Sequence, residues 1–307
     1  MKRLANKVFK KLTNHDEQLF AIGCAYLNLM RSKYSDIQAL TEVEYKVFSQ
    51  WGEDGIIDYL LSSIGVSKPK FIEIGTEDYK ESNTRFLFER TQCQGLIVDC
   101  DPQLNEKVKS WLSTWKGDLT AVSSFVSKSN IRSILQSANY EDNVDLFSLD
   151  IDGVDYWVLK ELPEKFAKVV VVEFNPIFGP DLEITVPYQD TFFRTDYHYS
   201  NLCWGASLTA FISLLNDKGF TFVGTNLNCS NAFFVENSFT DCLNLDFSLT
   251  TNRATFTNNF MRESRNKDGS LSYLSGKDRL KEISNCKVVD LSKNPHQKVS
   301  LSQIISD

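Results

Sequence analysis

Residues 146–157 read LFSLDIDGVDYW and place three carboxylates within six positions: Asp150, Asp152 and Asp155. The apolar residues before them are typical of a buried strand. A further carboxylate, Glu173, stands near the end of the apolar run KVVVVEF. Because the carboxyl ends of parallel strands meet at one edge of a sheet, we expect Asp150, Asp152 and Glu173 to face one pocket.

Carboxylates that lie this close in a half-buried site need a cation or a shared proton. The cluster predicts a hard divalent cation such as Mg²⁺, Mn²⁺ or Ca²⁺, held by Asp152 and Glu173, and His198 as a third ligand would favour Mn²⁺ or Fe²⁺. Alternatively, Asp150, Asp152 and Glu173, assisted by His198, form a general base for a hydroxyl group. As a third possibility, the carboxylates bind sugar hydroxyls and the ammonium group of methionine without taking part in catalysis. We expect Asp155 to stabilise the first turn of a helix, and Asp152 could instead cap that helix.

Strands and helices alternate along most of the chain and position these acids. Helices are expected over 49–65, 82–92, 103–115, 129–138, 155–162 and 205–220, and strands over 70–75, 95–100, 119–122, 144–150, 168–174, 220–226 and 231–237. The last two strands are too close in sequence for a crossover helix, so they must pair antiparallel. This pattern predicts an α/β fold with a doubly wound sheet that binds its ligand at the carboxyl ends of the strands.

The loop after the first predicted strand, in FIEIGTEDYKESNT, selects the ligand. A dinucleotide site would need the pattern G-x-G-x-x-G, but only Gly75 is present. Glu77 and Asp78 would oppose a phosphate, so a cationic ligand without phosphate is favoured. S-adenosylmethionine, with its sulfonium and ammonium groups, fits this requirement. Asp99, 24 residues after Gly75, is placed to accept hydrogen bonds from ribose hydroxyls.

Composition narrows the class of protein. The chain has 307 residues, a formal net charge of −7 and no apolar run long enough to span a bilayer. Its acidity disfavours nucleic acid as a partner. The seven cysteines show no CxxC pair and their number is odd, which fits a cytoplasmic protein.

Three segments are expected from these patterns. Residues 1–47 form an N-terminal helical extension, residues 48–237 form the α/β domain, and residues 238–307 form a C-terminal addition. The addition is rich in Asn, Ser and Thr and is interpreted as a lid, an oligomer arm or a partly disordered tail. A homo-oligomer is therefore left open.

The α/β segment resembles the FkbM-like S-adenosylmethionine-dependent methyltransferases, in particular a bacterial branch found in surface-polysaccharide clusters. The resemblance covers roughly residues 48–236 and rests on these motifs: SQWGEDGIIDYL, FIEIGTEDYKESNT, GLIVDCDP, SLDIDGVDYWVLKEL, VVVVEFNP, GASLTAFISLLNDKGFTFVGTN and NAFFVEN. It implies the seven-stranded class I methyltransferase fold, which is Rossmann-like, and methyl transfer to an oxygen, often on a sugar or nucleotide-sugar.

The resemblance also implies roles for individual residues. Glu73, Gly75 and Thr76 would surround the methionine part of the cofactor, Asp99 the ribose, and Asp150 and Asp152 the reacting end, and we add Asn83 to this cofactor site. The second and third glycines of the usual loop are missing, which affects the expected pose of the cofactor. Two alternatives remain: a nucleotide-sugar oxidoreductase, and a non-catalytic carbohydrate-binding or assembly protein on the same fold.

Overall fold

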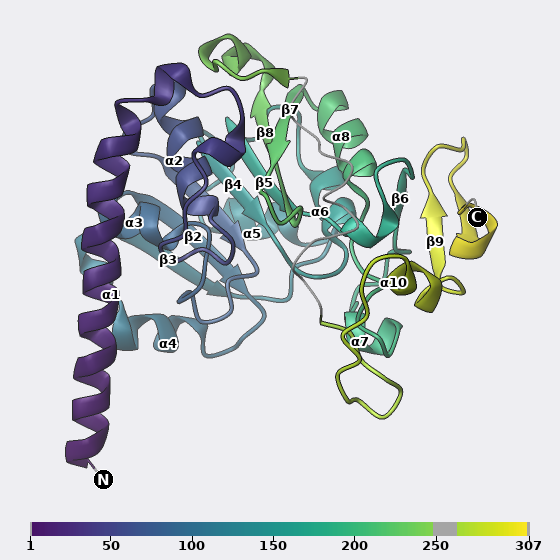
Figure 1. Cartoon of the computed structure of the whole chain (residues 1–307), viewed down its shortest axis with the longest axis horizontal. Helices are drawn as coiled ribbons and strands as arrows, with labels where there is room; N and C mark the ends of the chain where they lie inside the picture. The colour runs from purple at the N-terminus through teal and green to yellow at the C-terminus, as the bar shows by residue number, and fades with distance from the viewer. Residues whose placement is uncertain (1, 248–262, 306–307) are drawn as a thin grey trace.

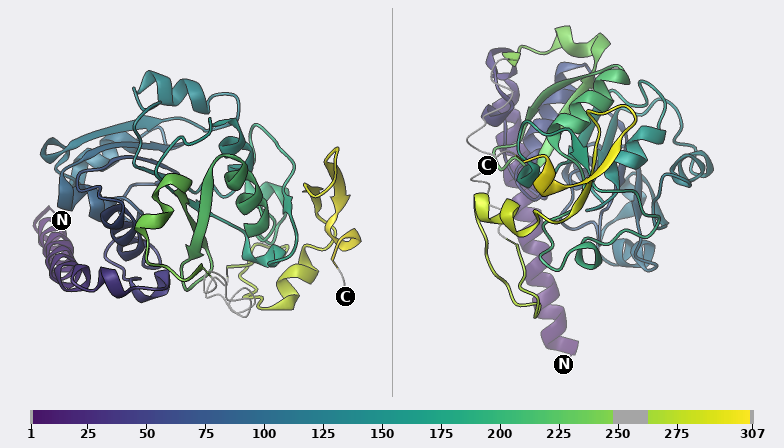
Figure 2. Two further views of the ribbon diagram at one scale, coloured as in Figure 1. Left: turned by 90° about the horizontal axis from the view of Figure 1, so that it is seen from above. Right: turned by 90° about the vertical axis from the view of Figure 1, so that its right-hand side faces the viewer.

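A computed structural model describes residues 2–247 and 263–305. Figure 1 shows a central sheet with helices on both faces, a long N-terminal helix along one side and the C-terminal residues on the opposite side. The left view of Figure 2 likewise shows the N-terminal helix and the described C-terminal part on opposite sides of the molecule. Within these residues, no helix is both long and apolar enough to cross a membrane.

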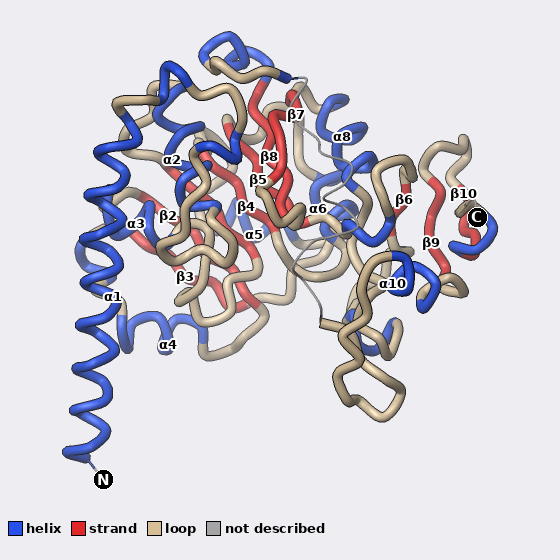
Figure 3. Tube along the Cα trace, in the orientation of Figure 1, coloured by secondary structure: helices blue, strands red, loops and turns tan. Residues whose placement is uncertain are grey.

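The central sheet has seven strands in the order β3-β2-β1-β4-β5-β8-β7 (Figure 3). The strands are β1 (Lys70–Ile74), β2 (Gln94–Asp99), β3 (Asp118–Ser123), β4 (Leu146–Leu149), β5 (Val169–Glu173), β7 (Phe220–Thr225) and β8 (Asn231–Glu236). Strands β1 to β5 pair in parallel, whereas β8 pairs antiparallel with both β5 and β7. The predicted doubly wound class I methyltransferase sheet, closed by an antiparallel hairpin, is therefore confirmed.

Helices cover both faces of the sheet because its inner strands are apolar on both sides. The helices are α1 (Lys2–Arg31), α2 (Glu53–Ser63), α3 (Arg85–Thr91), α4 (Leu104–Trp111), α5 (Ile131–Ser137), α6 (Asp155–Glu161), α7 (Arg194–Tyr197), α8 (Leu208–Asp217) and α10 (Lys277–Glu282). Side chains of α2, α3 and α4 share one core cluster with Phe71 and Val171. Those of α5, α6 and α8 share the other with Ile72 and Val172.

Helix α2 begins four residues later than the sequence pattern indicates. Gly52 has a φ of 120°, which interrupts helical geometry, and the backbone N–H groups of residues 47–49 donate to Asp54 instead of continuing a helix. Ser49 and Asp54 also bond reciprocally, since the Asp54 N–H donates to the Ser49 hydroxyl. The stretch SQWGED is thus a rigid turn that leads into the helix.

The N-terminal helix packs on the same side of the sheet as α2 and α3. Its Gly23 lies against Val47 and Phe86, where a Cβ atom would approach Val47 to 2.6 Å. Arg31 forms an ion pair of 2.7 Å with the buried Asp58 of α2. The predicted helical extension is therefore a helix to Arg31, followed by two short 3-10 turns at Tyr34–Asp36 and Leu40–Glu42.

A second, three-stranded sheet joins the C-terminal part to the α/β domain. Its strands run in the order β10 (Gln297–Ser300), β9 (Lys287–Asp290) and β6 (Ile184–Thr185), and β6 belongs to the segment that follows β5. The sequence pattern indicated neither β6 nor this pairing. Residues 248–262 of the predicted C-terminal addition lie outside the described residues.

Candidate active site

Gly75 begins the site at the carboxyl end of β1. Its φ is +84°, and a Cβ atom at this position would lie 1.5 Å from the carbonyl oxygen of Asp150. Only glycine allows this approach, because it lacks a Cβ atom and tolerates a positive φ. The close contact brings the loops after β1 and β4 together, as the predicted acidic pocket requires.

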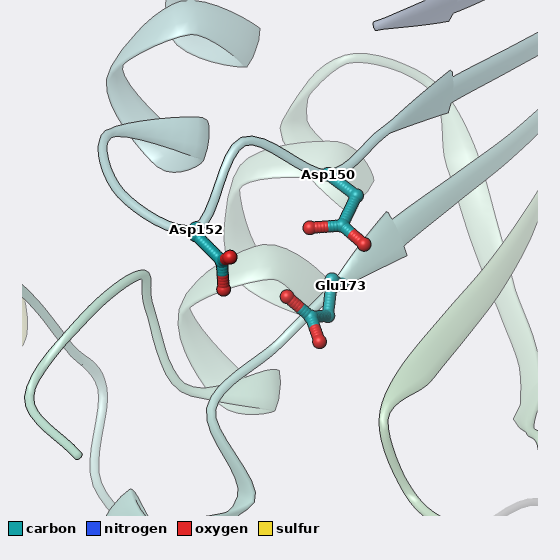
Figure 4. A group of neighbouring side chains, drawn as sticks. All are labelled: Asp150, Asp152 and Glu173. Carbon is teal, nitrogen blue, oxygen red and sulfur yellow. The ribbon is translucent and has the colours of Figure 1, made fainter. Parts of the chain in front are cut away.

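The acids of the adjacent strands are brought to one level of the sheet. Leu149 of β4 pairs with Ile74 of β1 and with Val172 of β5. The next residues along β4 and β5, Asp150 and Glu173, therefore lie side by side. Ligand atoms of Asp150, Asp152 and Glu173 all lie within 4.8 Å of one another, and their carboxylates point toward one another (Figure 4). The predicted gathering of these three side chains is present.

Proton affinity in this cluster is strongly perturbed. Burial, together with the negative charge of Asp152, raises the pKa of Asp150 to about 8. Burial and the charges of Asp150 and Asp152 raise the pKa of Glu173 well above its usual value. Because both pKa values are raised, carboxyl groups of this pair hold protons at a pH where free carboxyl groups have lost them.

Asp155 has a different role, as expected. It is 1% exposed, and its two carboxylate oxygens accept the backbone N–H groups of Ile151 and Gly153, each at 2.9 Å. These bonds hold the loop that carries Asp150 and Asp152. Asp152 does not cap α6, because the residue before that helix is Val154. Asp152 itself has a φ of 53° and forms an ion pair with Arg194 at 2.8 Å.

His198 lies apart from the acidic cluster. Its Nδ1 atom is 2.7 Å from the Ser200 hydroxyl, and its ring centroid is 4.4 Å from that of Tyr199. Burial lowers its pKa, with Glu282 and Lys267 as charged neighbours. His198 is neither among the metal-capable groups of the described residues nor among those that line the adjacent cavity. The structure therefore does not bring it to Asp152 and Glu173.

A cavity of about 400 Å³ opens beside the acids at the carboxyl ends of β1, β2 and β4. Six acidic side chains line it: Glu73, Glu77, Glu81, Asp99, Asp150 and Asp152. Arg194 is the basic side chain among the described lining residues, and it is already paired with Asp152 and Glu263. Such a lining favours a positively charged ligand.

Asp99 accepts hydrogen bonds from the backbone N–H groups that a phosphate would need as donors. Its Oδ2 accepts the backbone N–H groups of Thr76 and Glu77, at 3.0 and 2.8 Å. In a dinucleotide site, N–H groups of this loop bind the diphosphate. Here they are bound to an acid of the chain itself, which opposes a phosphate both by charge and by competition.

The remaining predicted cofactor residues also lie at the cavity. Glu73 is 4% exposed, and its carboxylate accepts bonds from Ser82, Asn83 and Thr84, so it holds the loop before α3. Asn83 donates to the Ser148 hydroxyl at 3.1 Å. Thr76 is buried and its hydroxyl has no partner among the described residues, which leaves that hydroxyl for a ligand.

Apolar groups complete the cavity. Val98, Phe125 and Val126 line it near the ends of β2 and β3, and Phe192 and Phe193 line it from the segment before α7. Phe193 is 50% exposed and its ring lies 5.6 Å from that of Phe125. Of the aromatic residues between 188 and 205, Phe192 and Phe193 therefore form part of the cavity wall.

Sequence reasoning missed several residues at this site. Arg194 gave no signal, because a single arginine in a loop has no distinguishing pattern. Glu53 and Gln50 lie in the SQWGED motif. The group of polar residues that precedes an apolar helix in this motif is the pattern that could have indicated them. Gln50 lines the cavity, and Glu53 is fully buried behind it.

No protein-family model matches this chain, and no curated protein matches it. Among solved structures, an S-adenosylmethionine-dependent methyltransferase from Clostridium acetobutylicum is similar over 60% of this chain and 90% of its own, with 11% identity and a TM-score of 0.38. An O-methyltransferase family protein from Burkholderia thailandensis covers 60% and 59%, with 10% identity and a TM-score of 0.37. A DUF574 family protein from Streptomyces avermitilis covers 60% and 80%, with 15% identity and a TM-score of 0.40.

Proposed function

We propose that this chain is an S-adenosylmethionine-dependent O-methyltransferase that acts on a hydroxyl of a sugar or nucleotide-sugar in surface-polysaccharide biosynthesis. The observation that carries the proposal is that Asp99 accepts the Thr76 and Glu77 N–H groups in a cavity whose charged lining residues are six acids and one arginine. A phosphorylated dinucleotide would lose its donors and meet negative charge there. A sulfonium donor needs neither phosphate donors nor a basic lining.

The cofactor would lie along the cavity from β2 to β4. Asp99 retains acceptor capacity for ribose hydroxyls, Val98, Phe125 and Val126 offer an apolar surface for the adenine, and the Thr76 hydroxyl lies free near the methionine part. Glu73 would contribute indirectly, because its oxygens are already bound by the loop before α3. The reactive methyl group would then lie near Asp150.

Methyl transfer would be a single in-line displacement. The acceptor oxygen forms a bond to the methyl carbon, the carbon–sulfur bond breaks, and its electron pair stays on sulfur to give S-adenosylhomocysteine. The hydroxyl proton passes to the Asp150–Glu173 pair. A base whose pKa is about 8 is well matched to this task at neutral pH, and alignment of the two reactants supplies much of the rate.

The acidic cluster also fits a divalent cation. Its oxygen ligands suit Mg²⁺ or Mn²⁺, and the buried Glu173 Oε2 has no hydrogen-bond partner among the described residues. Asp152 and Glu173 would hold such an ion, which would lower the pKa of a nearby hydroxyl. His198 lies elsewhere, so the preference for Fe²⁺ that a histidine ligand would confer loses its basis.

The sugar acceptor would occupy the part of the cavity bounded by Asp152, Phe193 and Thr195. A half-exposed aromatic ring can stack against the apolar face of a sugar ring, while carboxylates and hydroxyls bind its polar edge. The FkbM-like motifs in the sequence support this class of acceptor.

Titration calorimetry with S-adenosylmethionine and with NAD⁺ tests the proposal. We expect S-adenosylmethionine to bind and NAD⁺ not to bind, and we expect methyl transfer to appear when nucleotide-sugars are screened. Tight NAD⁺ binding would favour the oxidoreductase alternative and overturn the proposal. Binding of S-adenosylmethionine without transfer to any nucleotide-sugar would favour the non-catalytic alternative.

A further inference from the structure

Asn231 extends the acidic row by one strand. It begins β8, where it pairs directly with Glu173 at the end of β5. Side chains of directly paired residues lie on the same face of a sheet. Asn231 also lines the cavity that Asp150 and Asp152 line, and it is only 6% exposed.

Glu53 fixes the orientation of the Asn231 amide. Its Oε1 accepts the Nδ2 of Asn231 and the Nδ2 of Asn226, each at 2.8 Å. Its Oε2 accepts the backbone N–H groups of Trp51 and Gly52, at 2.9 and 3.0 Å. Because both oxygens of Glu53 act as acceptors, Asn231 must turn its NH₂ group toward Glu53 and its Oδ1 away.

Two buried oxygens are consequently left without a donor. Neither Asn231 Oδ1 nor Glu173 Oε2 has a hydrogen-bond partner among the described residues. A buried unsatisfied acceptor costs about 1–3 kcal/mol, so such atoms in a folded protein call for an explanation. Two acceptors on directly paired residues, beside Asp150 and Asp152, call for a group that is positively charged.

We propose that Asn231 is a ligand residue of this site, whose Oδ1, together with Glu173 Oε2, binds a positively charged group. Two sources share this chemistry: a divalent cation, and the ammonium of the methyl donor, the second of which rests on the function proposed above. Glu53 is a positioning residue, since it does not line the cavity and acts through the Asn231 amide.

Binding measurements on the full chain test this role. N231L keeps a similar side-chain volume but removes the oxygen. Mn²⁺ binding is followed by electron paramagnetic resonance, and S-adenosylmethionine binding by calorimetry. We expect N231L to weaken one of the two by at least about tenfold, the loss of a ligand that is bound to a charged group. Loss confined to Mn²⁺ identifies a metal ligand, and loss confined to S-adenosylmethionine identifies an ammonium ligand.

E53Q tests the positioning role without touching the cavity. A glutamine amide can donate to Asn231 Oδ1 and turn the NH₂ group toward Glu173, so E53Q should weaken the same ligand as N231L. E44Q is the matched control, because Glu44 accepts the Leu227 N–H in the same β7–β8 hairpin at 2.7 Å and bonds a different residue. We expect E44Q to bind both ligands as the wild type does.

The outcomes separate this inference from the proposed function. Unchanged affinity of N231L for both ligands, at a native melting temperature, overturns the inference even if the wild type transfers methyl groups. An effect of N231L without one of E53Q overturns the positioning role of Glu53. Parallel loss of both ligands and of thermal stability indicates a purely structural role and also overturns it. If the wild type binds neither Mn²⁺ nor S-adenosylmethionine, both proposals fail.

Discussion

Two sets of buried or half-buried carboxylates lie at the same end of the sheet and differ in their hydrogen-bond donors. Glu73 and Asp155 accept bonds from backbone N–H groups of the loops beside them. Asp150 and Glu173 face each other, and one Glu173 oxygen has no partner among the described residues. The first set stabilises loops, whereas the second keeps its binding capacity for a ligand.

The pKa values follow the same division. The pKa of Asp155 is raised to about 6 by burial, and the N–H groups of Ile151 and Gly153 oppose that rise. The pKa of Asp150 is raised further, to about 8, because burial is reinforced by the charge of Asp152. Residue type and burial are therefore not enough to assign a role. The donors around each carboxylate decide it.

The largest expected effect is on turnover. Under the proposed function, D150N would remove the proton acceptor next to the reacting hydroxyl, so the rate constant for methyl transfer should fall by at least ~10²-fold. Affinity for S-adenosylmethionine should fall only slightly, which calorimetry can confirm. D142N, at an exposed aspartate that precedes β4 and so lies at the opposite end of that strand from the site, serves as the control and should keep full activity. Full activity of D150N would show that Asp150 has no catalytic role and would remove this difference between the two sets.

The next largest effect is on stability and should distinguish the sets directly. E73Q introduces an NH₂ group where only acceptors fit, and it should lower the free energy of unfolding by about 2–4 kcal/mol. E173Q should leave that free energy unchanged or raise it, because it removes a charge from a buried acid pair. Urea unfolding of the two variants provides the measurement. Equal losses in both would show that the two sets are alike.

The pH dependence of stability follows from the raised pKa of Asp150. Between about pH 4 and pH 8 the folded chain keeps a proton that the unfolded chain has released, so this group contributes less stability as the pH rises. D150N removes the titration and should melt a few degrees above the wild type at pH 8, with a smaller difference at pH 5. A difference that is constant with pH would contradict the raised pKa of Asp150.

The smallest effect concerns Arg194, which bridges Asp152 and Glu263. Its side chain is partly exposed, so R194M should lower the free energy of unfolding by less than about 1 kcal/mol. The loss of positive charge should tighten Mn²⁺ binding a few-fold, because the cluster becomes more negative. Weaker Mn²⁺ binding by R194M would indicate that Asp152 needs its partner to stay in place.

Much of the fold could be predicted from the sequence because the signal is local. The apolar runs that end at Ile74, Leu149 and Glu173, separated by helical patterns, determine a parallel sheet. The short spacing between β7 and β8 requires antiparallel pairing. The three-stranded sheet could not be predicted, because β6 has only two residues and pairs with a strand about a hundred positions away.

The candidate site was predicted in part. Asp150, Asp152 and Glu173 could be placed together, because each follows or ends a predicted strand. His198 could not be placed, since it lies in a loop whose path depends on tertiary contacts with Ser200 and Tyr199. Glu53 reaches Asn231 across 178 positions of sequence, and no local pattern records that contact.

By itself, the sequence determined which residue types stand at the ends of the strands, because hydrophobic periodicity sets the strands and the residues after them form the edge. Only the tertiary structure decided which of those acids are satisfied. A carboxylate's role depends on the donors within about 3 Å of its oxygens, and those donors come from loops and helices distant in sequence.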